Sequence, residues 1–156
     1  MLRFVRFVNN LLRLNGRLAA DRADQARDGY LIEWSNHGPE RYISYSDNDR
    51  ELDVHADFTL LNDVVLYSDS LRSWTAPQRK EVTPFEYQKV LNRVIRYLSC
   101  WGDVRIDDRK LQDSEDLKRA LTELGIDFTE RDDGIIVYRA DADSMRKRFR
   151  EEKRDS

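Results

Sequence analysis

The segment ELDVHADF, residues 51–58, has the clearest alternation of apolar and polar residues in the chain. Successive side chains of a β-strand point to opposite faces of its sheet. The apolar residues of the segment would share one face: Leu52, Val54, Ala56 and Phe58. The polar residues would share the other: Glu51, Asp53, His55 and Asp57. We therefore predict a strand with one face in the core and an acidic face in solvent.

Two further strands are expected before this segment. Residues 30–34 and 41–46 are short runs rich in aromatic and β-branched residues, and the intervening Asn-His-Gly-Pro at 36–39 is typical of a turn. Residues 47–49, Asp-Asn-Asp, predict a second turn. Residues 64–67 are apolar throughout, which favours a strand covered on both faces.

The strongest helix signal lies at residues 83–99. Thr83 can cap the helix, Pro84 suits its first position, and Glu86 can complete a capping box. Beyond it, apolar residues recur at helical spacing: Tyr87, Val90, Leu91, Val94, Ile95 and Leu98. We expect this amphipathic helix to pack on the sheet.

A helix is also expected at the N-terminus. Residues 2–12 have apolar residues at roughly helical spacing, and Gly16 is the predicted C-terminal stop. The polar stretch at 18–28 is compatible with a further helix. We expect the N-terminal helix to dock on the domain.

The C-terminal third predicts a strand, a helix and a hairpin in turn. The strand is expected at 104–107, and the helix would begin at Ser114 and stop at Gly125. The hairpin would pair residues 126–131 with 135–139. A last charged helix would begin near residues 141–144.

Together these elements predict an α+β fold. Its small, mostly antiparallel sheet would be packed by the helix at 83–99, with an N-terminal helix and a C-terminal helix–hairpin–helix appendage. A chain of 156 residues is the size of one domain. We expect a single domain over residues 1–156, with its core in 29–110 and the appendage at 111–156.

The composition favours a non-secreted, cytoplasmic protein. Cys100 is the only cysteine, so no internal disulfide can form, and we expect it to be a small core residue. Arg3, Arg6 and Arg13 interrupt the apolar run that a signal peptide needs. No segment approaches the roughly 20 apolar residues of a membrane span. We therefore expect no membrane partner.

Motifs for catalysis, cofactors and metals are missing from the sequence. It has no glycine-rich phosphate loop and no serine nucleophile elbow. Its two histidines, His37 and His55, are too sparse for a zinc site. Residues 47–58 fail as a calcium loop because Leu52 and Phe58 stand where glycine and glutamate are needed. We predict no enzymatic activity, no cofactor and no metal.

Charge is distributed unevenly along the chain. Residues 28–71 contain ten acidic residues against two arginines, a net charge of −8, whereas the whole chain carries −3. The remaining residues therefore carry +5. A segment so biased, with one acidic strand face, would attract a basic partner. The alternative is that these charges only solubilise a sheet face.

A series of motifs between Tyr42 and Asp107 resembles a known family. Tyr45-Ser46-Asp47 is followed by Arg50 and an alternating strand, and Leu-Tyr-Ser-Asp-Ser-Leu at 66–71 is followed by Trp74. The capped helix and the strand at 104–107 come next. In this order the motifs resemble immunity protein 74, a family of bacterial immunity proteins from polymorphic toxin systems. The resemblance spans less than half of the chain.

The resemblance implies that the protein neutralises a cognate toxin by direct, stoichiometric binding. It marks Tyr67, Ser70 and Trp74 as scaffold positions. Toxins of such systems are often nucleases with basic grooves, which an acidic surface could occupy. We therefore expect partner-binding residues among the acidic residues of the turn and strand: Asp47, Asp49, Glu51, Asp53 and Asp57.

A regulatory or adaptor domain is the alternative function. It would contact nucleic acid or a membrane through the arginines of the N-terminal helix and through residues 146–148, Arg-Lys-Arg. We expect weak nucleic-acid binding at most, because the net charge is −3 and the densest charged patch is acidic.

Overall fold

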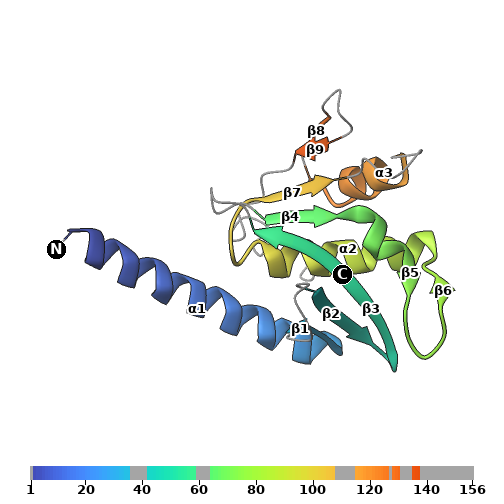
Figure 1. Cartoon of the computed structure of the whole chain (residues 1–156), viewed down its shortest axis with the longest axis horizontal. Coiled ribbons are helices and arrows are strands. Elements are labelled where there is room, and N and C mark those ends of the chain that lie inside the picture. Colours follow the sequence, from blue (N-terminus) through green and yellow to red (C-terminus); the bar gives the residue numbers. More distant parts are fainter. Residues whose placement is uncertain are drawn as a thin grey trace, which may run out of the picture.

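The computed structural model describes residues 2–35, 42–58, 64–107, 115–126, 128–130 and 135–137. Its centre is a twisted sheet with helix α2 packed against one face, and helix α1 extends away from the sheet (Figure 1). The helices are α1 (Leu2–Asp28), the 3-10 helix η1 (Ser68–Arg72), α2 (Pro84–Leu98) and α3 (Glu115–Glu123). The strands are β1 (Tyr30–Ser35), β2 (Tyr42–Asp47), β3 (Arg50–Phe58), β4 (Val64–Tyr67), β5 (Ser73–Trp74), β6 (Lys80–Glu81), β7 (Val104–Asp107), β8 (Thr129–Glu130) and β9 (Ile135–Val137).

The main sheet has the strand order β1-β2-β3-β4-β7-β9-β8. All neighbouring strands in it are antiparallel except β4 and β7, which are parallel because the chain crosses from one to the other through α2. Strands β5 and β6 form a separate pair. The predicted α+β fold with a mostly antiparallel sheet is confirmed.

The core lies between the sheet and α2. Leu52, Val54 and Ala56 are buried on the α2 side of β3, as the alternation predicts. Phe58 was expected with them, but 39% of it is exposed. The prediction was wrong because β3 runs past the core at this point, where the Phe58 ring contacts Trp34 and Trp101 instead. On β4, Val65 and Tyr67 are half-buried, so the expected cover of that strand on both faces is incomplete.

Helix α2 begins with the predicted capping box. The Thr83 hydroxyl accepts from the Glu86 backbone N–H at 3.3 Å, and the Glu86 carboxylate accepts from the Thr83 N–H at 2.9 Å. The apolar stripe predicted for this helix is buried throughout. Cys100, just past the helix end, is also buried, as expected for a core residue.

Helix α1 is longer than the sequence predicts. It does not stop at Gly16 but continues to Asp28, and it ends at Gly29, whose φ of +71° suits glycine. Glycine inside a helix costs only about 1 kcal/mol relative to alanine, and strong helix formers surround Gly16. The stop prediction was therefore wrong. Within the described ranges, no helix is both long enough and apolar enough to cross a bilayer.

The C-terminal hairpin strands pair with the main sheet, and helix α3 packs on the core. Strand β9 pairs with β7, and Leu117, Leu121 and Ile126 belong to the same core cluster as α2. Gly125 ends α3 with a φ of +67°, as predicted. The turn at 36–39, the Ser114 cap and the last charged helix lie outside the described residues.

Candidate partner-binding surface

Strand β3 carries the predicted row of exposed carboxylates. Glu51, Asp53 and Asp57 are exposed on its face away from the core, and His55 stands among them. We call Glu51, Asp53 and Asp57 the acidic β3 face. Residues two apart on a strand are spaced by about 7 Å. The face therefore presents carboxylates at fixed intervals.

The neighbouring strands leave part of this face open and orient the rest. The residues opposite Glu51 and Asp53 on β2 are serines, whose side chains are short. Opposite His55, the Tyr42 ring packs on the imidazole with centroids 4.8 Å apart. Asp57 accepts a hydrogen bond of 2.9 Å from the Tyr67 hydroxyl. Asp57 is thus held in one orientation, whereas Glu51 and Asp53 lie beside small neighbours.

The backbone under the acidic β3 face is fixed on both sides. One edge of β3 pairs with β2. On the other, Glu51 exchanges backbone hydrogen bonds with residues 75 and 76, at 2.7 and 3.0 Å. The His55 N–H donates to the Ser70 hydroxyl at 3.0 Å, and that hydroxyl donates to the Tyr67 carbonyl at 2.7 Å. Ser70 therefore joins η1 to β3, which accounts for it as a scaffold residue.

Trp74 is a core residue. Only 1% of it is exposed, and its ring packs near Tyr45 and under the Arg50 guanidinium, whose carbon lies 4.1 Å from the ring centroid. The expectation that Trp74 is scaffold agrees with this position. Tyr67 is half-buried and contributes its hydroxyl to Asp57.

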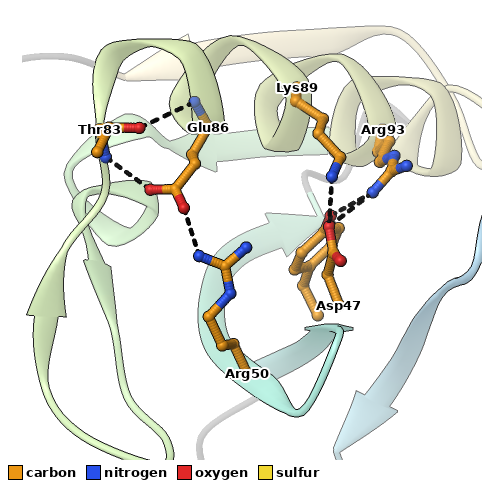
Figure 2. Close-up of polar contacts among 7 residues, drawn as sticks. Asp47, Arg50, Thr83, Glu86, Lys89 and Arg93 are labelled. Carbon is orange, nitrogen blue, oxygen red and sulfur yellow. Dashed lines mark hydrogen bonds and ion pairs between the residues drawn. The ribbon is translucent and has the colours of Figure 1, made fainter.

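Asp47 does not belong to the exposed surface, although the sequence places it among the candidate binding residues. It is 4% exposed and lies under α2 (Figure 2). One of its carboxylate oxygens receives hydrogen bonds from Lys89 at 2.8 Å, from Arg93 at 2.9 Å and from the Tyr45 hydroxyl at 3.1 Å. Asp47 is therefore a structural anchor between the hairpin and α2.

The electrostatics of this anchor favour charged Asp47. Burial alone would raise the pKa of Asp47, but the Lys89 ammonium, the Tyr45 hydroxyl and the Arg93 guanidinium together lower it. For the neighbouring Tyr45, burial is the dominant cause. It raises the pKa of Tyr45 to about 12 and keeps that hydroxyl protonated. A protonated hydroxyl can donate to Asp47 while it accepts from Arg93 at 2.8 Å.

A second contact ties the start of β3 to α2. Arg50 donates to the Glu86 carboxylate, which also closes the capping box with Thr83 (Figure 2). The backbone hydrogen bond from Thr83 and the bond from Arg50 lower the pKa of Glu86 to about 2. The β2–β3 hairpin is thus held to one helix at two points, by Asp47 and by Arg50.

The helix residues that hold the hairpin were not predicted from the sequence. Lys89 and Arg93 are four apart on α2, and both are directed at Asp47 (Figure 2). Two cations one turn apart beside the apolar stripe of this helix are a signal that could have indicated a carboxylate near the core. The tight turn between β2 and β3 was predicted, and its residues Asn48 and Asp49 have φ values of 50° and 65°. Asp49 is exposed there, beyond the end of the acidic β3 face.

The exposed candidates are suited to electrostatic recognition. Among the side chains that the structure describes, no group of three or more histidine, cysteine, aspartate or glutamate residues is placed to hold a metal ion. Carboxylates at fixed spacing on a rigid strand can receive arginine or lysine side chains from a partner.

Comparisons with protein-family models, with curated proteins and with solved structures return no match to this chain.

Proposed function

We propose that this protein is an immunity protein, which neutralises a cognate bacterial toxin by binding it directly through the acidic β3 face. The observation that carries the proposal is the placement of Glu51, Asp53 and Asp57. They are exposed on one face of a strand whose other face is buried in the core. The partner would be a toxin domain with a basic surface, such as the substrate groove of a nuclease.

The rigidity of the hairpin supports this role. A binding surface that is already ordered loses less conformational entropy when its partner docks. Here the two contacts with α2 and the backbone bonds to residues 75 and 76 hold β3 before any partner arrives. The carboxylates then act mainly on the association rate, because opposite charges steer the encounter.

The sequence resemblance to immunity protein 74 also supports the proposal, and it overlaps this surface. The stretch that carries the resemblance, Tyr42 to Asp107, includes β2, β3, β4, α2 and β7. Asp49, at the turn, would add a further exposed carboxylate to the contact. Asp47 is left out because it is buried in its own ion pairs.

The proposal predicts that a neighbouring gene encodes the toxin domain, and the test uses that domain. Co-expression should restore growth of cells that make the toxin, and calorimetric titration should give a one-to-one complex. The triple variant E51K/D53K/D57K should protect poorly and bind at least about 100-fold more weakly, because reversed charges in an interface each cost on the order of 1 kcal/mol or more.

A matched control reverses acidic residues elsewhere. Asp103 and Glu123 are also exposed, but they lie off β3. The variant D103K/E123K should bind the toxin as the wild type does. If both variants bind with wild-type affinity, the acidic β3 face is only a solvated surface. If neither the wild type nor the variants bind the neighbouring toxin, the immunity function itself is wrong.

A further inference from the structure

Helix α1 extends beyond the body that it is docked on. Its contacts with the body include Gln25, which accepts from the Ile32 N–H at 2.9 Å, and Asp21, which pairs with buried Arg96 at 3.6 Å. Both residues lie in the C-terminal half of the helix. The N-terminal half projects away from the sheet (Figure 1). The contacts named here between α1 and the body therefore lie in its C-terminal half.

The projecting part has the residue pattern of an amphipathic helix. With 100° between successive residues, the apolar residues between positions 4 and 18 fall on about half of the helix circumference. They are Phe4, Val5, Phe7, Val8, Leu11, Leu12, Leu14 and Leu18, with Asn15 as the polar exception on that half. Arg3, Arg6, Arg13 and Arg17 share the opposite side. Because Gly16 does not break the helix, the two sides stay in register along its length.

The charge of this segment sets it apart from the rest of the chain. Residues 2–17 contain four arginines and no acidic residue, a net charge of +4. Since the whole chain carries −3, the remainder carries −7. A second copy could cover the apolar side, but it would bring no anionic groups for the arginines, because the segment contains no acidic residue. The segment instead complements a surface that is both anionic and apolar.

The apolar side of α1 continues onto the body. Leu12 is 63% exposed. Steps of three or four residues lead from residue 4 through 8, 11 and 15 to Leu18 and Arg22, so these positions lie on the same side of the helix. Leu18 and Arg22 line a groove of about 740 Å³ together with Trp34, Tyr97 and Trp101. Tyr97 is buried, whereas Trp34 and Trp101 are half-buried. Tryptophan favours the boundary between lipid and water, because one end of its ring system is apolar and the other is polar.

Although the lack of a membrane span in the sequence led us to expect no membrane partner, we propose that α1 binds the surface of an anionic membrane. The helix lies in the plane of the lipid headgroups, with its apolar side in the acyl boundary and its arginines beside lipid phosphates. The aromatic groove is the point where the body meets the membrane. The acidic β3 face is a different surface, so this proposal does not depend on the identity of the toxin.

The experiment is sedimentation of the full chain with lipid vesicles. One set contains phosphatidylcholine with about one third phosphatidylserine, and the other contains phosphatidylcholine alone. An arginine near an anionic surface strengthens binding by about fivefold. The wild type should therefore bind the anionic vesicles at least about 100-fold more tightly than the neutral ones, and less tightly as salt is raised.

Two variants and a matched control locate the contact. R6E/R13E should lower the binding constant by at least about 25-fold, because two favourable charges are removed and two unfavourable ones are added. L12E should have a similar effect, since it puts a carboxylate on the apolar side. R79E/R119E makes the same charge change at two exposed arginines off α1 and should bind as the wild type does.

Three results would overturn the proposal. The wild type could fail to sediment with either vesicle, the α1 variants could bind as tightly as the control, or the wild type could form a dimer that L12E alone dissociates. Light scattering after gel filtration measures the last of these, which would assign the apolar side of α1 to a second copy. Far-UV circular dichroism of L12E in buffer checks that the helix is retained.

Discussion

Asp47 and Arg93 lie 2.9 Å apart, and they join the turn of the β2–β3 hairpin to the middle of helix α2. The same Arg93 reaches the C-terminal end of α1, donating to the Asp28 carbonyl at 3.4 Å, and its guanidinium lies 4.1 Å from the Tyr30 ring centroid. One arginine thus connects the hairpin, α2 and the end of α1. Arg93 therefore helps to fix the position of the acidic β3 face relative to α1.

Replacing Asp47 should destabilise the fold strongly. Asp47→Asn removes a buried negative charge and leaves Arg93 and Lys89 without their counterion, which costs about 3 kcal/mol by analogy with other broken buried pairs. Chemical denaturation measures this loss. Asp49→Asn, at the exposed next-but-one position in the same turn, should change stability by no more than about 0.5 kcal/mol. Equal effects of the two substitutions would contradict the burial of Asp47.

Stability should fall as the pH is lowered through the acid range. Glu86 has a folded pKa of about 2 against an ordinary value of 4.5, and the pKa of Asp47 is lowered from 3.8. Groups with lowered folded pKa values stabilise fully above their unfolded pKa, and this contribution is lost as the pH falls towards the folded value. The free energy of unfolding should therefore decline between about pH 5 and pH 2.

The Glu86 share of this pH dependence can be isolated. Glu86→Gln keeps a side chain that can cap the helix but no longer titrates, so its unfolding free energy should fall less steeply below pH 4.5. Unfolding curves at a series of pH values for both proteins provide the comparison. Parallel curves would mean that Glu86 is not held by Thr83 and Arg50 in solution.

Much of the fold was predictable because its signals are local. The alternation at 51–58 and the capping box at 83–86 each depend on residues within one element, and both predictions are confirmed except at Phe58. The burial of Asp47 was not predictable in this way. It depends on Lys89 and Arg93, which are more than forty positions away in the sequence. An aspartate in a turn is usually solvated, and only the packing of the hairpin against α2 changes that.

The length of α1 shows a second limit of sequence patterns. Glycine is common at helix ends, and Gly16 follows an apolar run, so a stop there was a reasonable prediction. Whether a glycine ends a helix depends on the φ angle that the surrounding structure imposes. Gly29 has the positive φ that a stop requires, whereas Gly16 is inside the helix. The exposed candidates Glu51, Asp53 and Asp57 were placed correctly, because strand alternation alone fixes their side.

Gly16, inside α1, and Gly29, just past its end, should respond in opposite directions to the same substitution. No heavy atom lies within 4 Å of a Cβ added at Gly16, so Gly16→Ala should raise helix stability by about 0.5–1 kcal/mol. Gly29→Ala places a side chain at φ +71° and should destabilise by about 1 kcal/mol. Thermal melts followed by far-UV circular dichroism measure both. A destabilising Gly16→Ala would show that the helix breaks at Gly16 in solution.

The association rate with the toxin should depend steeply on salt. Steering by the acidic β3 face acts over distances that ions screen, with a Debye length of about 8 Å at physiological ionic strength. Stopped-flow measurements should therefore give a rate that falls several-fold between low and high salt for the wild type and much less for E51K/D53K/D57K. The melts of the two proteins should be similar, because exposed substitutions usually change stability by about 0.5 kcal/mol or less each. A salt dependence shared by both proteins would place the steering charges elsewhere.

The contact between Arg50 and Glu86 should be measurable as a coupling energy. Arg50→Met removes the charge but leaves an extended side chain that can still pack on Trp74, and Glu86→Gln removes the carboxylate charge. The side chains are 31% and 24% exposed, so we expect a coupling of about 1 kcal/mol, above the usual value for a surface pair and below that for a buried one. The measurement is the free energy of unfolding of the wild type, both single variants and the double variant.

Repeating the cycle in high salt should reduce the coupling, because a partly exposed ion pair is partly screened. A coupling below about 0.2 kcal/mol at low salt would mean that the start of β3 is not joined to α2 at this point, and that Asp47 holds the hairpin alone.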